Sequence, residues 1–323
     1  MARWNSEKRG GGRVSDCRSA KLGVFGMFGS EVTDRVRCSM CAVAALLVVA
    51  GAGCGSDASS SAPVAKAGAA TSADEFSPSN FDEKSITVDN KYFPLEPGAQ
   101  YTFEGNDSVN GVTTPHRVVF TVTDLVKKID GVNVVVVWDR DFVRDELEES
   151  ELTFFAQDTT GTVWHLGQYR EQYEGLEFTG GRAWMVGHLE GAKAGIFMLA
   201  DPGAGTPSYS EGYAPPPYYW TDRAQVDQVG QTTTVPAGTY DDVLVTKEFN
   251  DQEPGAIQLK YYAPGIGNVR VGWTGDDTEQ ENLQLVKVAH LDDAALADAR
   301  SEALKLEAHA NVYGSSPPAE SRR

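Results

Sequence analysis

The sequence predicts an all-β fold: a strongly curved antiparallel sheet or open half-barrel of about ten strands, with one C-terminal helix. Short runs rich in β-branched and aromatic residues recur between about residues 85 and 290, and turn-forming residues separate them. No helical periodicity lies between these runs, which excludes alternating strand and helix units and therefore a parallel sheet.

The clearest strands are predicted from hydrophobic pattern and turn chemistry. Residues 117–123 alternate in character, and residues 132–138 are almost continuously apolar after a turn at residues 128–131. Residues 158–161 (Asp-Thr-Thr-Gly) and Pro264-Gly265 are further candidate hairpin turns. The remaining strand candidates are residues 99–104, 151–157, 161–167, 195–200, 242–249, 256–263, 267–273 and 282–288.

One helix is predicted over residues 294–310, with Asp292 or Asp293 as its N-cap. Its helically spaced apolar positions are Leu296, Ala299, Ala303, Leu306 and Ala310. Because this face is thin and alanine-rich, we expect the helix to pack weakly or to protrude. Residues 314–323 are expected to be disordered.

The N-terminal region has the pattern of an export signal. Residues 41–53 carry no charge, follow Arg35 and Arg37, and as a helix would span about 20 Å, short of a hydrocarbon core of about 30 Å. An ordinary signal peptide with an incidental cysteine is one interpretation. Residues 1–34 mix acidic with basic residues, which is unusual ahead of such a segment and suggests a start annotated too early.

Residues 51–54 (Gly-Ala-Gly-Cys) resemble the lipobox of bacterial lipoproteins. The resemblance implies that residues 1–53 are removed and that Cys54 carries a diacylglycerol. The protein would then be lipid-anchored in the cell membrane, facing outside the cytoplasm, with the lipid bilayer as its partner. The expected organisation is a lipidated N-terminus and flexible linker (54–84), a β-sheet domain (85–290), and a helix with its tail (291–323).

Charge and cysteine content narrow the function classes. The whole chain has 28 basic and 46 acidic residues, and loss of residues 1–53 removes eight and four of these. The mature 270 residues then hold 20 basic and 42 acidic groups, a net charge of −22, which argues against nucleic-acid binding. Cys54 is their only cysteine, so internal disulfides and thiolate metal sites are excluded.

Catalytic signatures are missing from the sequence. No G-x-S-x-G, H-E-x-x-H, P-loop or G-x-G-x-x-G motif occurs, so no enzyme activity, cofactor or metal is predicted. His116, His165, His188 and His290 are interpreted as structural, since none lies at metal-ligand spacing from another. The acidic residues at 138–141, 144–151 and 276–277 are interpreted as solvated charge in preference to calcium ligands.

The most unusual stretch is residues 208–220, in which three consecutive prolines lie among aromatic residues. These aromatics either cover the core as a lid or provide stacking surfaces for a ligand. The candidate ligand contacts are Trp164, His165, Trp184, Tyr218, Tyr219 and Trp220.

Residues 92–98, 235–240 and 260–267 resemble the recurring segments of the DUF3108/TapB-like proteins, an uncharacterised bacterial family. That resemblance implies a curved antiparallel sheet whose concave face holds something apolar, and it assigns no catalytic residue. The leading hypothesis is therefore a non-catalytic lipoprotein that binds or escorts an apolar ligand or acts as an envelope accessory. The alternatives are a carbohydrate-binding module using residues 208–220 and a hydrolase built on His165 or His188.

Overall fold

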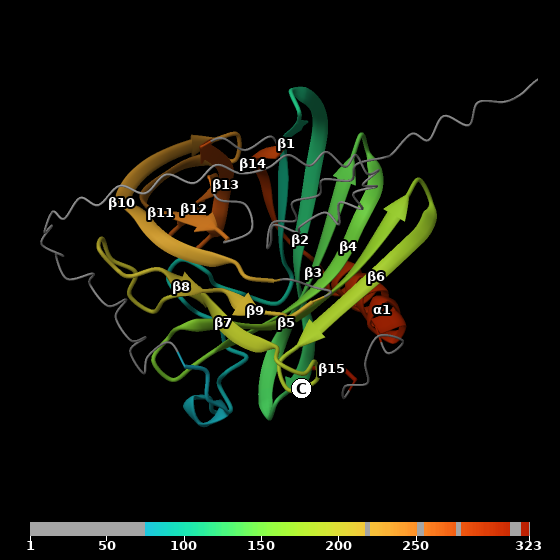
Figure 1. Ribbon diagram of the computed structural model, residues 1–323. Coiled ribbons are helices and arrows are strands. Elements are labelled where there is room, and N and C mark those ends of the chain that lie inside the picture. The colour runs from blue at the N-terminus through green and yellow to red at the C-terminus, as the bar shows by residue number, and fades with distance from the viewer. Residues whose placement is uncertain (1–74, 217–219, 251–254, 276–278, 311–317, 323) are drawn as a thin grey trace, which may run out of the picture.

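The computed structural model describes residues 75–216, 220–250, 255–275, 279–310 and 318–322 (Figure 1). This part of the chain is all-β with one C-terminal helix, as predicted. The long strands are β1 (Ala99–Val109), β2 (Val112–Ile129), β3 (Val132–Val143), β4 (Glu146–Gln157), β5 (Val163–Glu174), β6 (Glu177–Met185), β7 (Lys193–Met198), β10 (Arg223–Val235), β11 (Gly238–Phe249), β12 (Ala256–Ala263), β13 (Gly267–Gly275) and β14 (Glu279–His290). The two-residue strands are β8 (Tyr209–Ser210), β9 (Gly212–Tyr213) and β15 (Glu320–Ser321).

These strands form one curved antiparallel sheet of fifteen strands, which is more than the about ten expected. The order is β8-β10-β11-β12-β13-β14-β1-β2-β3-β4-β5-β7-β9, with β15 beside β2 and β6 beside β5. The additional strands are the two-residue strands β8, β9 and β15 and two longer polar strands, β6 and β10, which lack a strong apolar alternation. The polar sequences of β6 and β10 do not predict strands, and both are stabilised by pairing with their neighbours in the sheet.

The sheet consists of two meanders joined edge to edge. β1 to β5 are neighbours in chain order, and so are β10 to β14. β14 then pairs with β1 over its whole length, from Ala99 opposite His290 to Val109 opposite Glu279. In Figure 1 the second meander, in orange, lies beside the first, in teal to green, and the sheet bends between them to form an inner face.

Tight turns set the strand registers. Asn110 and Gly111 have φ angles of 51° and 80° between the paired residues Val109 and Val112, as a two-residue type I′ hairpin requires. Asp130 and Gly131 repeat this geometry with φ of 46° and 84°, which confirms the turn predicted at residues 128–131. The predicted turn at Pro264-Gly265 likewise joins β12 to β13.

Each face of the sheet has its own core. Phe120, Val137 and Phe155 alternate with outward-pointing neighbours and meet Leu283 from the second meander on the inner face. On the outer face, Leu152 and Phe154 pack in a separate cluster that includes residues of the C-terminal helix. The helix thus covers the outer side and leaves the inner side to the two meanders.

The helix α1 (Asp293–Ala310) confirms the predicted C-terminal helix. The Asp292 carboxylate accepts a hydrogen bond from the Ala295 N–H at 2.9 Å, which identifies Asp292 as the N-cap. The predicted apolar positions Ala299, Ala303, Leu306 and Ala310 are buried against the sheet. Two ion pairs, Arg300 with Asp124 and Lys127 with Glu307, hold the helix to β2, so it is docked on the sheet and does not protrude.

Both ends of the described chain depart from the sequence-based expectations. Residues 76–84, expected to be linker, contact the sheet: Phe76 and Phe81 pack against Trp164. In the tail, expected to be disordered, β15 pairs with β2, and the Ala319 N–H donates to the Glu307 carboxylate at 2.9 Å. The order of these segments comes from their tertiary partners. Their own short sequences therefore do not predict it.

Candidate functional site

The inner face divides into an apolar half and a charged half. In the charged half, eight carboxyl groups and three basic groups point inward from both meanders, and we call this set the interior charge cluster. Its members are Asp107, His116, Asp139, Asp141, Glu149, Glu151, Arg170, Glu211, Glu248, Lys260 and Glu281. All are buried except Asp107, whose side chain is 16% exposed. Carboxyl groups remain in excess even when the half-buried Arg182, opposite Arg170 on β6, is added.

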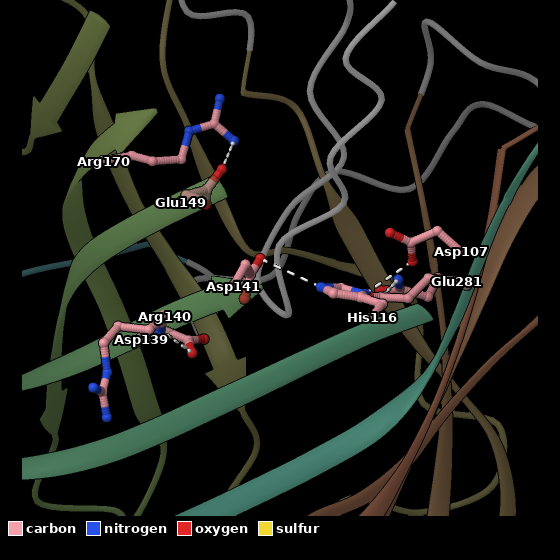
Figure 2. A network of polar contacts seen from close by, with 9 residues as sticks. Asp107, His116, Asp139, Arg140, Asp141, Glu149, Arg170 and Glu281 are labelled. Atoms are coloured by element: carbon pink, nitrogen blue, oxygen red, sulfur yellow. Dashed lines mark hydrogen bonds and ion pairs between the residues drawn. The ribbon is translucent and has the colours of Figure 1, made fainter. Parts of the chain in front are cut away.

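His116 occupies the junction of the two meanders, between two carboxylates (Figure 2). Its Nδ1 lies 2.9 Å from Asp107 Oδ1 and 3.3 Å from Glu281 Oε1, and the three atoms all lie within 4.8 Å of one another. Burial lowers the pKa of His116, but the Asp107 hydrogen bond and the charges of Glu281 and Asp141 outweigh it and raise that pKa to about 10. A cationic imidazole or a bound cation therefore suits this position.

The carboxylate of Asp141 faces the opposite side of the same imidazole. Asp141 Oδ2 lies 4.0 Å from His116 Nε2, and neither carboxylate oxygen has a hydrogen-bond partner within the described residues. The residue is only 2% exposed, so burial raises the pKa of its carboxyl group well above the ordinary value. A buried carboxylate without a hydrogen-bond donor is costly, so Asp141 is one of the unsatisfied groups of the cluster.

A second group of the cluster lies on β3, β4 and β5. Glu149 forms an ion pair of 2.9 Å with Arg170, and Glu151 accepts a hydrogen bond from the Thr153 hydroxyl at 2.7 Å. Burial raises the pKa of Glu151 to about 8 and that of Asp139 to about 7. Both shifts favour the neutral acid, which lowers the repulsion within the cluster.

The third group comprises Glu248 and Lys260 of the second meander and Glu211, which lies between β8 and β9. Lys260 pairs with Glu248, and both are buried, at 1% and 8% exposure. Burial raises the pKa of the Glu211 carboxyl well above its ordinary value, and the charge of Glu248 raises it further, whereas Lys260 opposes the shift. Lys260 is therefore the main cation that balances this end of the cluster.

The structure corrects two expectations about acidic residues. Asp139 and Asp141, interpreted as solvated charge at a strand end, are inward-pointing and 5% and 2% exposed. Glu149 and Glu151, in a run interpreted as a solvated face, are 2% and 6% exposed. The sequence did not reveal this because burial of alternate acidic residues on a sheet depends on the opposing meander, which lies far away along the chain. Asp276 and Asp277 lie outside the described residues.

Three of the candidate ligand contacts form a packed aromatic cluster. The ring of His165 lies 5.0 Å from that of Trp184 and 5.7 Å from that of Trp220. Trp184 and Trp220 are 1% and 5% exposed, so a ligand would reach them only if this cluster opened. Trp164 is separate, with its indole N–H bonded to the Asp158 carboxylate at 2.9 Å. Tyr218 and Tyr219 lie outside the described residues.

The two histidines named for a hydrolase, His165 and His188, lie in different surroundings. His165 is fully buried, and its ring nitrogens lie 3.2 Å and 3.1 Å from the backbone carbonyls of Glu211 and Gly167. Burial lowers the pKa of His165 to about 4, against the opposing effect of the two carbonyls. His188 is exposed in the loop after β6.

Part of the His116 site could be predicted from the sequence. The Asn110-Gly111 dipeptide is typical of a two-residue hairpin, and that turn fixes Val109 opposite Val112. Counting outward gives Asp107 opposite Thr114 and Gly105 opposite His116, so Asp107 and His116 are diagonal neighbours on one face. Glu281 gave no such signal, because its approach depends on the pairing of β14 with β1.

Comparison with known proteins identifies no family. No family model and no curated protein sequence matches the chain, so the DUF3108/TapB-like resemblance stays a prediction. Two similar solved structures are a Bacteroides fragilis protein described as exported with a YmcC-like fold and a Parabacteroides distasonis protein described as a lipoprotein. Their sequence identities are 16% and 13% and their TM-scores 0.36 and 0.37. Each match covers 62% of this chain and 99% of the other.

Proposed function

We propose that this chain is a lipid-anchored extracytoplasmic protein that binds, without catalysis, a positively charged ligand inside its curved sheet. The anchor is the diacylglycerol expected on Cys54, which lies outside the described residues. Among the residues that the structure does describe, no helix is long and apolar enough to cross a bilayer. The proposed membrane attachment is therefore supported by the export-signal pattern that precedes Cys54 in the sequence.

The apolar half of the inner face gives less support to an apolar ligand. Phe120, Val122 and Phe155 are 0–4% exposed and belong to one packed core cluster on this face. The cavity beside Phe93 and Phe120 has a volume of only about 20 Å³, which is room for about one water molecule. An acyl chain would need these side chains to move apart.

The charged half supports a cationic ligand, and the unsatisfied carboxylate of Asp141 is the observation that carries the proposal. Buried carboxylates in excess over buried cations repel one another in a medium of low dielectric. A ligand with positive charge would relieve that repulsion and supply the missing partners. A neutral sugar or lipid would not.

Ligand class is testable by thermal stability. The full mature chain in detergent is heated with Zn²⁺, Ca²⁺, spermidine or palmitate. We expect at least one of the cationic probes to raise Tm, since a ligand at 100 times its Kd stabilises the folded state by about 2.7 kcal/mol. Palmitate is expected to leave Tm unchanged. A rise with palmitate alone would contradict the proposal.

Membrane attachment has its own test. Replacing Cys54 with Ala is expected to move the protein from the membrane fraction to the soluble extracytoplasmic fraction, because the thioether to the lipid cannot form. Ser56→Ala, two residues away in the same polar segment, is the matched control and should leave the protein in the membrane fraction. Unchanged retention of the Cys54→Ala protein would disprove the lipid anchor.

A further inference from the structure

We propose that Asp107, His116 and Glu281 bind one divalent transition-metal cation, for which Zn²⁺ is the probe. This inference rests on the proposed cation-binding function and specifies where in the interior charge cluster the ligand lies. The donor set is one imidazole nitrogen and two carboxylate oxygens, from β1, β2 and β14. Such mixed nitrogen and oxygen donors suit Zn²⁺ and its first-row neighbours better than Ca²⁺, which takes oxygen ligands only.

The positions of the donor atoms fit a small cation. Tetrahedral zinc with bonds of about 2.1 Å requires ligand atoms about 3.4 Å apart. His116 Nδ1 already lies 3.3 Å from Glu281 Oε1 and 2.9 Å from Asp107 Oδ1. Asp107 therefore needs to withdraw by about half an ångström, which a 16% exposed side chain at a strand end can do. Three protein ligands leave a fourth position for water or for another group.

Asp141 is the positioning residue of this site. A histidine that binds metal through one ring nitrogen commonly donates the N–H of the other to a carboxylate, which fixes the tautomer and the ring orientation. Metal on Nδ1 leaves the proton on Nε2, the nitrogen that faces Asp141 Oδ2 at 4.0 Å. A closure of about 1 Å makes that contact a hydrogen bond and supplies the missing donor to Asp141. Figure 2 shows Asp141 directed at the ring from the side opposite Asp107 and Glu281.

The charges around the site favour a divalent cation. A divalent cation bound between Asp107 and Glu281 would balance both carboxylates, and the imidazole would still donate toward Asp141. Since the surrounding cluster has more carboxyl groups than basic groups, the additional positive charge is stabilised by residues beyond the three ligands.

Zinc titration of the full mature chain tests the proposal. The protein is purified in detergent, stripped with a chelator and titrated with Zn²⁺ by calorimetry, and bound metal is counted by mass spectrometry. We expect one Zn²⁺ per chain, loss of that ion in His116→Gln, and an affinity about 10–100-fold lower in Asp141→Asn with the stoichiometry unchanged. Asp227→Asn, which alters a carboxylate on the same sheet outside the interior charge cluster, is the control and should retain one Zn²⁺ with unchanged affinity.

Each alternative result has a defined meaning. Zn²⁺ binding that survives in His116→Gln would overturn this site while leaving the proposed cation-binding function intact. A wild-type protein that binds none of the cationic probes would overturn both. If His116→Gln does not fold, X-ray absorption of the zinc-loaded wild type decides: one imidazole in the first coordination shell supports the site, and an all-oxygen shell contradicts it.

Discussion

Replacing Lys260 with Met is expected to lower the free energy of unfolding by about 3–5 kcal/mol. Lys260 is 1% exposed and forms an ion pair with Glu248, which is itself 8% exposed. The substitution keeps most of the side-chain volume but removes the main cation at this end of the cluster. Glu248 must then remain buried without its charged partner or take up a proton. Chemical denaturation monitored by tryptophan fluorescence measures the change.

The control compares an exposed ion pair on the same sheet. Lys247 contacts Asp227 at 2.6 Å, but the two side chains are 36% and 19% exposed. Lys247→Met should therefore change the free energy of unfolding by less than about 1 kcal/mol. In the double variant with Glu248→Leu, much of the loss caused by Lys260→Met should return, because the orphaned carboxylate is gone as well. An equal effect of both lysine substitutions would contradict the assignment.

Acidification from pH 6.5 to about pH 4 is expected to lower the free energy of unfolding by about 3 kcal/mol through His165 alone. The pKa of His165 is lowered to about 4 in the folded state, from 6.5. In this window the unfolded chain therefore binds a proton that the folded chain does not, so the free energy of unfolding falls as pH falls. Above pH 6.5 the ring is neutral in both states and the effect is absent.

The measurement is a difference between two pH profiles. The free energy of unfolding of the wild type minus that of His165→Gln should decrease by this amount between pH 6.5 and pH 4, since the glutamine does not titrate. His290→Gln is the control, because the His290 side chain is 60% exposed and solvated in both states. A difference that stays constant across the window would show that folding does not lower the pKa of His165.

Local sequence information predicted the strands and the helix of this protein better than it predicted which elements pair or pack together. Hydrophobic alternation and turn dipeptides are consequences of neighbouring residues, so the strands around residues 117–123 and 132–138 and the helix after Asp292 were predictable. The polar strands β6 and β10 were not, since their stability comes from the strands beside them.

The candidate site was predictable only in part, for the same reason. The hairpin at Asn110 brings Asp107 beside His116 through a contact between near neighbours. Glu281 and Lys260 reach the interior through the second meander, and alternation of acidic with apolar residues is as compatible with a solvated strand face as with a buried one. Burial of charge in this fold is thus a tertiary property.

The pairing of β14 with β1 has a consequence for how the chain folds. The paired residues are 170 to 191 positions apart, from Val109 with Glu279 to Ala99 with His290. A chain made N-terminus first presents β1 long before β14, so the first meander has an open edge that could meanwhile pair with another chain. Such distant contacts also slow folding. The pairing of β14 with β1 is therefore the step at which a chaperone would have the most effect on yield.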